Sequence, residues 1–110
     1  MKQGEIWYAD LNPVQGSEQA GYRPLVIVIG NLLNAHANVV ICVPLTTKLK
    51  RYHGNLILDP LASNGLTEIS EALTLHVRSV SKTRLVRRMG AISKAELKQI
   101  HTCLQEILTY

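Results

Sequence analysis

Residues 16–24, which read Gly-Ser-Glu-Gln-Ala-Gly-Tyr-Arg-Pro, bring together a hydroxyl, a carboxylate, an amide, a phenol and a guanidinium. A connection of about a dozen residues is longer than most loops in a compact domain, and such loops are usually functional or disordered. Pro24 holds Arg23 in an extended conformation at the mouth of the strand that follows. Two interpretations stay open: a functional loop, and a mobile surface loop in which Glu18 pairs with Arg23.

A second polar cluster, which begins Thr46-Thr47-Lys48, follows the apolar run 39–43, whereas Arg23 precedes the apolar run 25–29. If these two runs pair as antiparallel strands, the residue that enters one and the residue that leaves the other lie at the same end of the sheet. Arg offers a planar fork to two phosphate oxygens, and Thr adds a further donor. The sequence therefore predicts a phosphate site at Arg23 and Thr46. It contains no Gly-rich nucleotide-triphosphate loop, so phosphoryl transfer from ATP is not expected.

The composition favours one small β-rich domain over residues 1–110. The chain is 46% hydrophobic but has no Phe and one Trp, so its core must come mainly from Leu, Ile and Val. Its net charge of +4 and pI near 9.3 suit a nucleic-acid partner or an acidic protein partner equally well. Charge alone decides nothing between them.

Cysteine and histidine spacing predicts neither a metal site nor a cofactor. Cys42 and Cys103 lie in apolar patterns without CxxC spacing, so we expect reduced core residues. The four histidines are scattered without ligand spacing. No apolar segment approaches the roughly 20 residues of a membrane span, and no N-terminal apolar run follows a basic region, so neither membrane spanning nor secretion is expected. The expected location is the cytoplasm.

The order of elements predicts an α+β domain of the small antiparallel barrel kind. Ser93 and Glu96 form a capping box, and the apolar stripe behind it, from Leu97 to Leu108, predicts a packed terminal helix. His101 beside that stripe is expected to be structural, and Ser81 should cap a short helical turn. Strands are expected at 4–9, 25–29, 39–43 closed by Pro44, 55–58, 71–80 and 89–92, with a polar connection at 31–38.

Five segments carry a resemblance to a known family, and they extend over essentially the whole chain. They are Gly4-Glu-Ile-Trp7, Leu11-Asn-Pro13, residues 16–24, Val43-Pro-Leu-Thr-Thr-Lys48 and Val77-Arg-Ser-Val-Ser-Lys-Thr-Arg-Leu85. On these segments the chain resembles the ribosome-independent mRNA interferase toxins of type II toxin–antitoxin modules, the MazF, PemK and Kid group. The resemblance implies a small SH3-like antiparallel β-barrel with a C-terminal helix, as in CcdB and MazF.

The resemblance also implies an endoribonuclease that cuts single-stranded mRNA at specific sequences without a metal ion. The 2′-hydroxyl attacks the adjacent phosphate and leaves a 2′,3′-cyclic phosphate and a 5′-hydroxyl end. Arg23 matches the position that stabilises the phosphorane and helps to protonate the leaving oxygen, and Thr46 matches one that holds a phosphoryl oxygen. Glu18 is the candidate base, although a nearby Arg23 would lower its pKa and weaken it. The RNA-binding candidates are Ser17, Gln19 and Lys48.

One departure concerns Leu75-His76, which stands where family members often carry an acidic residue followed by Gln. Leu75 cannot supply acid or base chemistry. An imidazole can exchange protons, hydrogen-bond or stack on a base, so we expect His76 to contact RNA. The alternative is a strand histidine that fills space at the sheet edge. No cleavage motif is predicted.

The family implies a homodimer with RNA in a groove at the subunit interface, and an acidic antitoxin whose disordered tail covers the sites. One competing hypothesis is a CcdB-like toxin that binds DNA gyrase, but that activity does not need the intact Arg23 and Thr46. A catalytically degenerate RNA-binding barrel is another. Against it, the aromatic residues do not alternate with basic residues along the sequence, as a stacking platform would favour.

Overall fold

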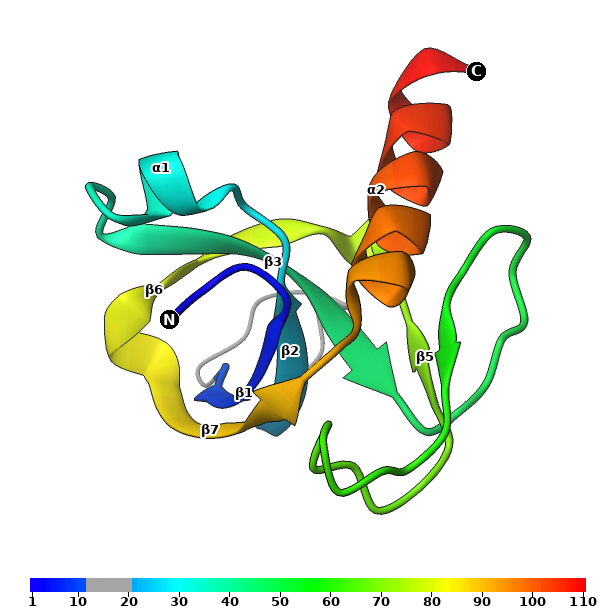
Figure 1. The fold of residues 1–110 in the computed structure, drawn as a ribbon, viewed down its shortest axis with the longest axis horizontal. Coiled ribbons are helices and arrows are strands. Elements are labelled where there is room, and N and C mark those ends of the chain that lie inside the picture. The colour runs from blue at the N-terminus through cyan, green and yellow to red at the C-terminus, as the bar shows by residue number, and fades with distance from the viewer. Residues whose placement is uncertain (12–20) are drawn as a thin grey trace.

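The computed structural model describes residues 1–11 and 21–110, and its strands form one curled antiparallel sheet with a helix at the C-terminal end (Figure 1). The strands are β1 Glu5–Asp10, β2 Tyr22–Ile27, β3 Val39–Thr46, β4 Ile57–Leu58, β5 Ser70–Ala72, β6 Arg78–Ser81 and β7 Leu85–Ala91. The helices are α1 Asn31–Asn34, α2 Lys94–Thr109 and the two 3₁₀ turns η1 Thr74–His76 and η2 Lys82–Arg84.

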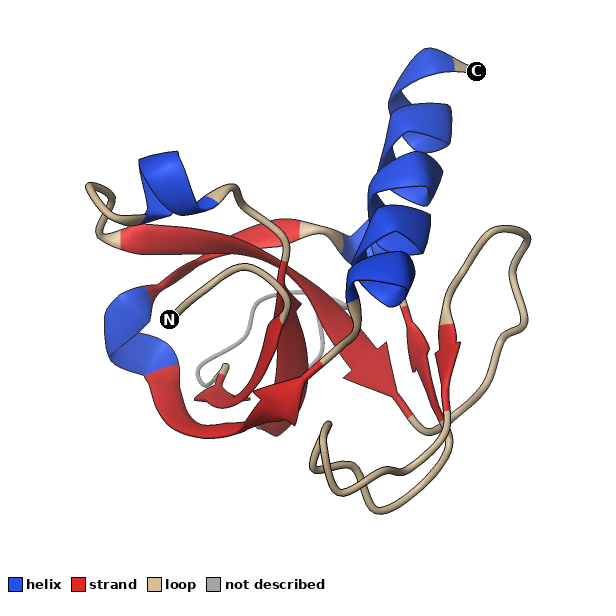
Figure 2. Cartoon of the chain, in the orientation of Figure 1, coloured by secondary structure: helices blue, strands red, loops and turns tan. Residues whose placement is uncertain are grey.

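The strand order is β4-β5-β3-β2-β1-β7, and β6 also pairs with β3. The turn η2 joins β6 directly to β7, so the far edges of the sheet curl toward each other into a half-barrel (Figure 2). Ser81 caps this turn by accepting a hydrogen bond from the backbone N–H of Thr83, as expected. The predicted α+β architecture is confirmed. Within the predicted polar connection 31–38, the structure places the short helix α1.

The strand β3 runs through Pro44 to Thr46, so the prediction that Pro44 closes this strand was wrong. Proline cannot donate a ladder hydrogen bond, but it can still accept one. Here the carbonyl of Pro44 accepts from the backbone N–H of Leu73 at 2.9 Å. The next two residues, Leu45 and Thr46, pair with β5, so β3 continues beyond the proline.

Residues 71–80 do not form the single strand that was predicted. Both halves of this segment pair with β3, but in different registers: Ala72 lies opposite Leu45, and Arg78 opposite Cys42. Between these pairs β3 advances by three positions and its partner by six. The surplus residues leave the ladder as η1, which splits the segment into β5 and β6.

Two apolar clusters occupy the two faces of the sheet. The first lies under α2 and has the buried members Ile6, Val26, Val28, Val43, Leu45, Leu56, Leu58, Leu66, Ala72 and Ile100. The second lies inside the curl and has the buried members Ala9, Leu11, Leu25, Ile27, Val40, Cys42, Val80 and Leu85. The predicted core of Leu, Ile and Val is confirmed. Both cysteines are buried free thiols, as expected, and burial raises the pKa of Cys42 to about 12.

The helix α2 begins with the predicted capping box: the Ser93 side chain accepts from the Glu96 N–H, and the Glu96 side chain accepts from the Ser93 N–H. Its first turns pack on the sheet, with Ile100 fully buried. The expected packing of the whole stripe was wrong, because Leu108 is 84% exposed. Figure 1 shows the last turns, in red, standing clear of the sheet. His101 is structural, with Nε2 3.1 Å from the carbonyl oxygen of Val28.

Candidate active site

The register of β2 and β3 brings Arg23 and Thr46 to the same end of the sheet. Leu25 lies opposite Pro44 in this antiparallel pair, so extending each strand by two positions places Arg23 opposite Thr46. The predicted antiparallel pairing, and with it the shared end, is confirmed. Because side chains alternate along a strand, both residues point to the face that carries Leu25, inside the curl.

Arg23 has a buried nitrogen that finds no partner among the residues that the structure describes. Its Nε has no hydrogen-bond acceptor within residues 1–11 and 21–110. A buried donor without a partner costs about 1–3 kcal/mol, which an anion bound at the guanidinium would offset. The second residue of β2 therefore presents a cationic fork at the strand end, in a position suited to a phosphate.

Thr46 ends β3 with a side chain that is only 7% exposed. Its hydroxyl oxygen accepts a hydrogen bond from the backbone N–H of Lys48 at 3.1 Å. This bond orients the hydroxyl and leaves its hydrogen to donate. It also begins the turn that carries Lys48, whose side chain is exposed.

The loop after β3 is held by Glu71, a fully buried carboxylate that the sequence reading placed only in a strand. It accepts hydrogen bonds from the backbone N–H groups of Lys50 at 2.6 Å, Arg51 at 2.7 Å and Tyr52 at 3.1 Å. The Nδ2 of Asn55 donates a fourth at 2.7 Å. Arg51 has a φ of 55°, a left-handed conformation that helps to aim successive N–H groups at one anion.

Desolvation acts to raise the pKa of Glu71, but the four hydrogen bonds outweigh it and the pKa is lowered from its ordinary value. Glu71 lies directly opposite Thr46 in the ladder between β3 and β5. From β5, Glu71 therefore holds in place the loop that follows Thr46 at the end of the neighbouring strand β3. The signal in the sequence was a lone carboxylate followed by the apolar residues Ala72 and Leu73.

Tyr8, Tyr22 and Arg87 form a stack on the opposite face of the same sheet end. The two tyrosine rings lie 5.6 Å apart with an interplanar angle of 16°, and the guanidinium carbon of Arg87 lies 5.2 Å from the centre of the Tyr8 ring. The sequence did not reveal this cluster, because its three members come from three strands. The aromatic and basic side chains lie next to each other in the folded sheet but not along the chain.

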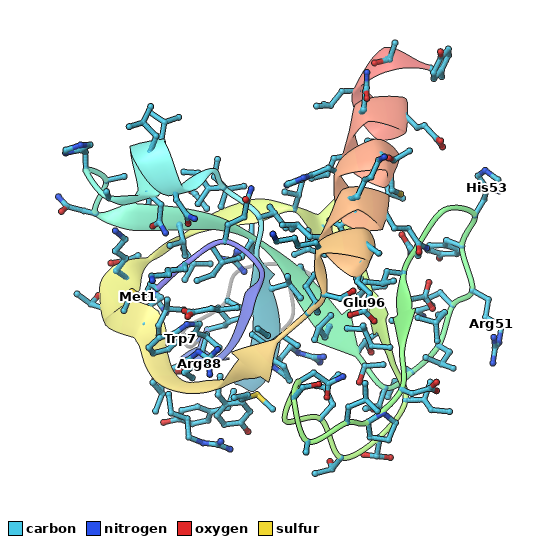
Figure 3. All side chains as sticks on the ribbon, viewed as in Figure 1. Met1, Trp7, Arg51, His53, Arg88 and Glu96 are labelled. Carbon is cyan, nitrogen blue, oxygen red and sulfur yellow. The ribbon has the colours of Figure 1, made fainter. Side chains whose placement is uncertain are left out.

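Side chains elsewhere on the sheet surface are tied to structural roles. Glu5 accepts from the Trp7 indole N–H at 2.9 Å and from Arg88 Nε at 3.1 Å, and Figure 3 shows the Trp7 and Arg88 side chains near each other.

In the loop between β3 and β4, Arg51 and His53 point away from the sheet (Figure 3). Across the described ranges, no group of three His, Cys, Asp or Glu side chains could hold a metal ion.

The model of one protein family, described as the PemK-like, MazF-like toxin of type II toxin–antitoxin systems, matches residues 2–108. The chain belongs to this family. It is 34% identical to the endoribonuclease MazF9 of Mycobacterium tuberculosis over 96% of this chain and 93% of that protein.

Among the solved structures that are similar to this MazF-like toxin, two illustrate the likeness. The Deinococcus radiodurans MazF has a TM-score of 0.83 and 21% identity, with coverage of 100% of this chain and 97% of that one. A mycobacterial endoribonuclease in complex with its cognate antitoxin has a TM-score of 0.79 and 25% identity, with coverage of 98% and 94%.

The family resemblance assigned roles to Ser17, Glu18 and Gln19, and these three residues lie outside the described ranges. The described part of this MazF-like toxin therefore brings together Arg23, Thr46 and the loop of Lys48. It adds Glu71, to which the resemblance assigned no role.

Leu75 and His76 are both exposed and lie in η1 rather than in a strand. The alternative of a strand histidine at the sheet edge was therefore wrong. Because β2 pairs with one edge of β3 and β5 and β6 with the other, Arg23 and His76 flank β3 from opposite sides. Any contact of His76 with RNA would thus lie across β3 from Arg23.

No helix in the described ranges is long and apolar enough to cross a membrane.

Proposed function

We propose that this MazF-like toxin is a metal-independent, sequence-specific endoribonuclease that cuts single-stranded mRNA. Its catalytic residues are Arg23 and Thr46. The observation that supports it best is the register that brings two groups to one sheet end. They are an oriented hydroxyl and a guanidinium whose Nε has no partner within residues 1–11 and 21–110. The similar MazF9 of Mycobacterium tuberculosis, at 34% identity, is named an endoribonuclease, which agrees with this activity. The whole chain, 1–110, acts as a single toxin domain.

In the proposed reaction, the ribose 2′-oxygen attacks the adjacent phosphorus and the bond to the 5′-oxygen breaks. A base takes the 2′-hydroxyl proton, and Glu18 is the candidate. The two charged oxygens of the phosphorane bind the Arg23 fork and the Thr46 hydroxyl, which stabilise charge that develops only in the transition state. The departing 5′-oxygen gains a proton with help from Arg23. The products are a 2′,3′-cyclic phosphate and a 5′-hydroxyl end.

The remaining contacts serve binding. Lys48 attracts the phosphate backbone from the loop that Glu71 holds, while Ser17 and Gln19 contact the RNA, and His76 contacts it on the far side of β3. Contacts of this kind position the strand and carry little sequence information unless they reach base edges.

The proposed protein partners are a second copy of the chain and a cognate acidic antitoxin. The net charge of +4 suits an acidic partner, and a similar mycobacterial endoribonuclease is solved in complex with its cognate antitoxin. The proposed location is the cytoplasm, where mRNA is available.

Cleavage of a long, weakly structured RNA in EDTA tests the activity. Wild type should cut it and leave the two stated ends, and Arg23→Ala and Thr46→Ala should each lose at least about 100-fold in rate, typical for removing a group that stabilises developing charge. Lys98→Ala and Thr102→Ala change the same kinds of side chain on the exposed surface of α2 and should cut normally. Absence of cutting by wild type across many RNA sequences would refute the ribonuclease and favour the gyrase-binding or degenerate alternative.

A further inference from the structure

The stack of Arg87, Tyr8 and Tyr22 crosses three neighbouring strands on one face of the sheet. Arg87 of β7 is the ladder partner of Tyr8 of β1, and Tyr8 in turn pairs with Pro24 of β2, two positions from Tyr22. The planar groups therefore lie in a row across the sheet. Tyr22, at the end of this row, is 54% exposed, so much of its ring remains open to solvent.

A cavity of about 300 Å³ adjoins this row. Tyr8, Arg87 and Met89 line one part of it, Pro24 and Thr47 line the strand ends, and five residues between Gly65 and Ser70 line the rest. Its volume is at the lower limit for ligand sites, enough for a small ring system rather than a large cofactor. The hydroxyl of Thr47 and the carboxylate of Glu68 provide hydrogen-bonding groups beside the planar ones.

This site and the candidate active site lie on opposite faces of the sheet, at the same ends of β2 and β3. Tyr22 precedes Arg23 on β2, and Thr47 follows Thr46 after β3. Since side chains of successive strand residues point to opposite faces, the phosphate site lies on one face and the aromatic row on the other, at the same sheet end. An RNA strand that passes over this end can present a phosphate to one face and a neighbouring base to the other.

We propose that the row of Tyr22, Tyr8 and Arg87, with its cavity, binds a nucleobase of the nucleotide that flanks the scissile phosphate. This inference rests on the proposed ribonuclease function and specifies where its substrate is held. Unpaired RNA bases stack on aromatic rings and on arginine planes. Arg87 forms no ion pair within the described part of the chain, so its guanidinium stays on the tyrosine ring as part of the platform.

The chemistry of the row favours a base over an apolar peptide side chain. A guanidinium and two phenols provide flat, polarisable faces with polar edges, and each stacked base is worth roughly 5- to 150-fold in affinity. Because stacking tolerates any base, hydrogen bonds from groups such as Thr47 and Glu68 would supply whatever selectivity this position has.

The test uses oligonucleotides of the cleavage sequence mapped with wild type, with a 2′-deoxy nucleotide at the cut so that they bind without reacting. Each carries 2-aminopurine at one position on either side of the cut, and stacking quenches its fluorescence. Wild type and Tyr22→Phe should bind alike and quench one flanking position. Tyr22→Leu should bind about tenfold more weakly and lose that quenching.

Two matched pairs separate stacking from charge and from the mere presence of a tyrosine. Arg87→Lys keeps the charge but loses the planar group, so it should weaken binding, whereas Lys98→Met removes a remote charge and should not. Tyr110→Leu changes a tyrosine that is 98% exposed beyond α2 and should leave binding and quenching unchanged. Thermal melting of every variant should stay close to that of wild type.

The outcomes distinguish this inference from the function on which it rests. A wild type that neither cuts nor binds RNA would overturn the ribonuclease proposal and this site with it. A wild type that cuts normally while Tyr22→Leu and Arg87→Lys bind as wild type does would overturn the base site alone. Unchanged RNA binding with weakened binding of the cognate antitoxin would also overturn it, because the face would then dock protein.

Discussion

Glu71 keeps a negative charge in the interior because four donors surround it. Glu71→Gln preserves the shape but replaces one accepting oxygen with an NH₂ group that faces donors. We expect a loss of about 2–4 kcal/mol in the free energy of unfolding, since buried donors are left without an acceptor. Urea denaturation measures it. Glu68→Gln, an exposed carboxylate three residues earlier, is the control, and a loss below about 0.5 kcal/mol for Glu71→Gln would contradict the assignment.

The pH dependence of stability should come from Glu5 and Glu71. Desolvation acts to raise the pKa of Glu5, but hydrogen bonds from Trp7, Lys2 and Arg88 outweigh it and lower the pKa from 4.5 to about 2. A carboxyl whose pKa is lower in the folded state stabilises that state above its unfolded pKa. That contribution is lost as the pH falls through the folded value.

Stability should therefore be constant for these groups above the ordinary pKa of 4.5 and fall toward pH 2. Glu5→Gln should remove about 1–2 kcal/mol of the decline between neutral pH and about pH 3, because a neutral amide binds no proton there. Denaturant titrations at a series of pH values measure the decline. A variant whose curve parallels that of wild type below pH 4.5 would show that Glu5 titrates alike in both states.

At the scale of elements, the turn between β4 and β5 is locked onto β7 by a close approach of backbone. A Cβ at Gly90 would lie 2.4 Å from the carbonyl oxygen of Ser63 and 2.6 Å from the carbonyl carbon of Asn64. Asn64 holds the turn itself, since its Oδ1 accepts from the N–H groups of Leu61 and Leu66. The cavity beside Tyr8 and Arg87 is bounded by this part of the chain.

Gly90→Ala should therefore lower the free energy of unfolding by at least about 2 kcal/mol, because the backbone must shift to admit a methyl group. Gly30→Ala is the matched control: a Cβ there meets nothing within 4 Å, so a change within about 0.5 kcal/mol is expected. Chemical denaturation compares the two. Equal stability of both variants would mean that β7 and the turn separate easily.

Sequence patterns predicted those elements whose signals are local. The capping box of α2 and the apolar runs of β2 and β3 were recognised because each signal lies within a few residues. The break of 71–80 into β5, η1 and β6 was not predicted, because it follows from two registers against β3 that no local pattern shows. The prediction for Pro44 failed for the same reason: its carbonyl accepts a hydrogen bond from Leu73, 29 residues later in the chain.

The candidate site was predictable to the extent that strand ends determine it. Arg23 and Thr46 follow from an antiparallel pairing that the apolar runs already favoured. Glu71 and the row of Tyr8, Tyr22 and Arg87 could not be found in this way, since their partners come from loops and strands distant in sequence. Hydrogen bonds to backbone N–H groups, as at Glu71, also leave no mark on the identity of the residues that donate them.

Over the whole molecule, a net charge of +4 provides a general attraction for RNA. The position of each basic side chain decides whether it also contacts a phosphate directly. Lys48 lies two residues after Thr46, whereas Lys98 lies on the exposed surface of α2. If Lys48 neutralises one phosphate of a bound single strand, it releases counterions on binding. The slope of log affinity against log salt concentration then carries a contribution of about 0.7 from this one contact.

Lys48→Ala should therefore weaken binding of the 2′-deoxy substrate analogue at low salt and reduce the magnitude of that slope by about 0.7. Lys98→Ala, which makes the same change in net charge, should leave the slope within error of wild type. Fluorescence anisotropy over a series of salt concentrations gives both slopes. Equal reductions in the two variants would mean that RNA senses only the total charge, and Lys48 would then have no direct contact with the phosphate backbone.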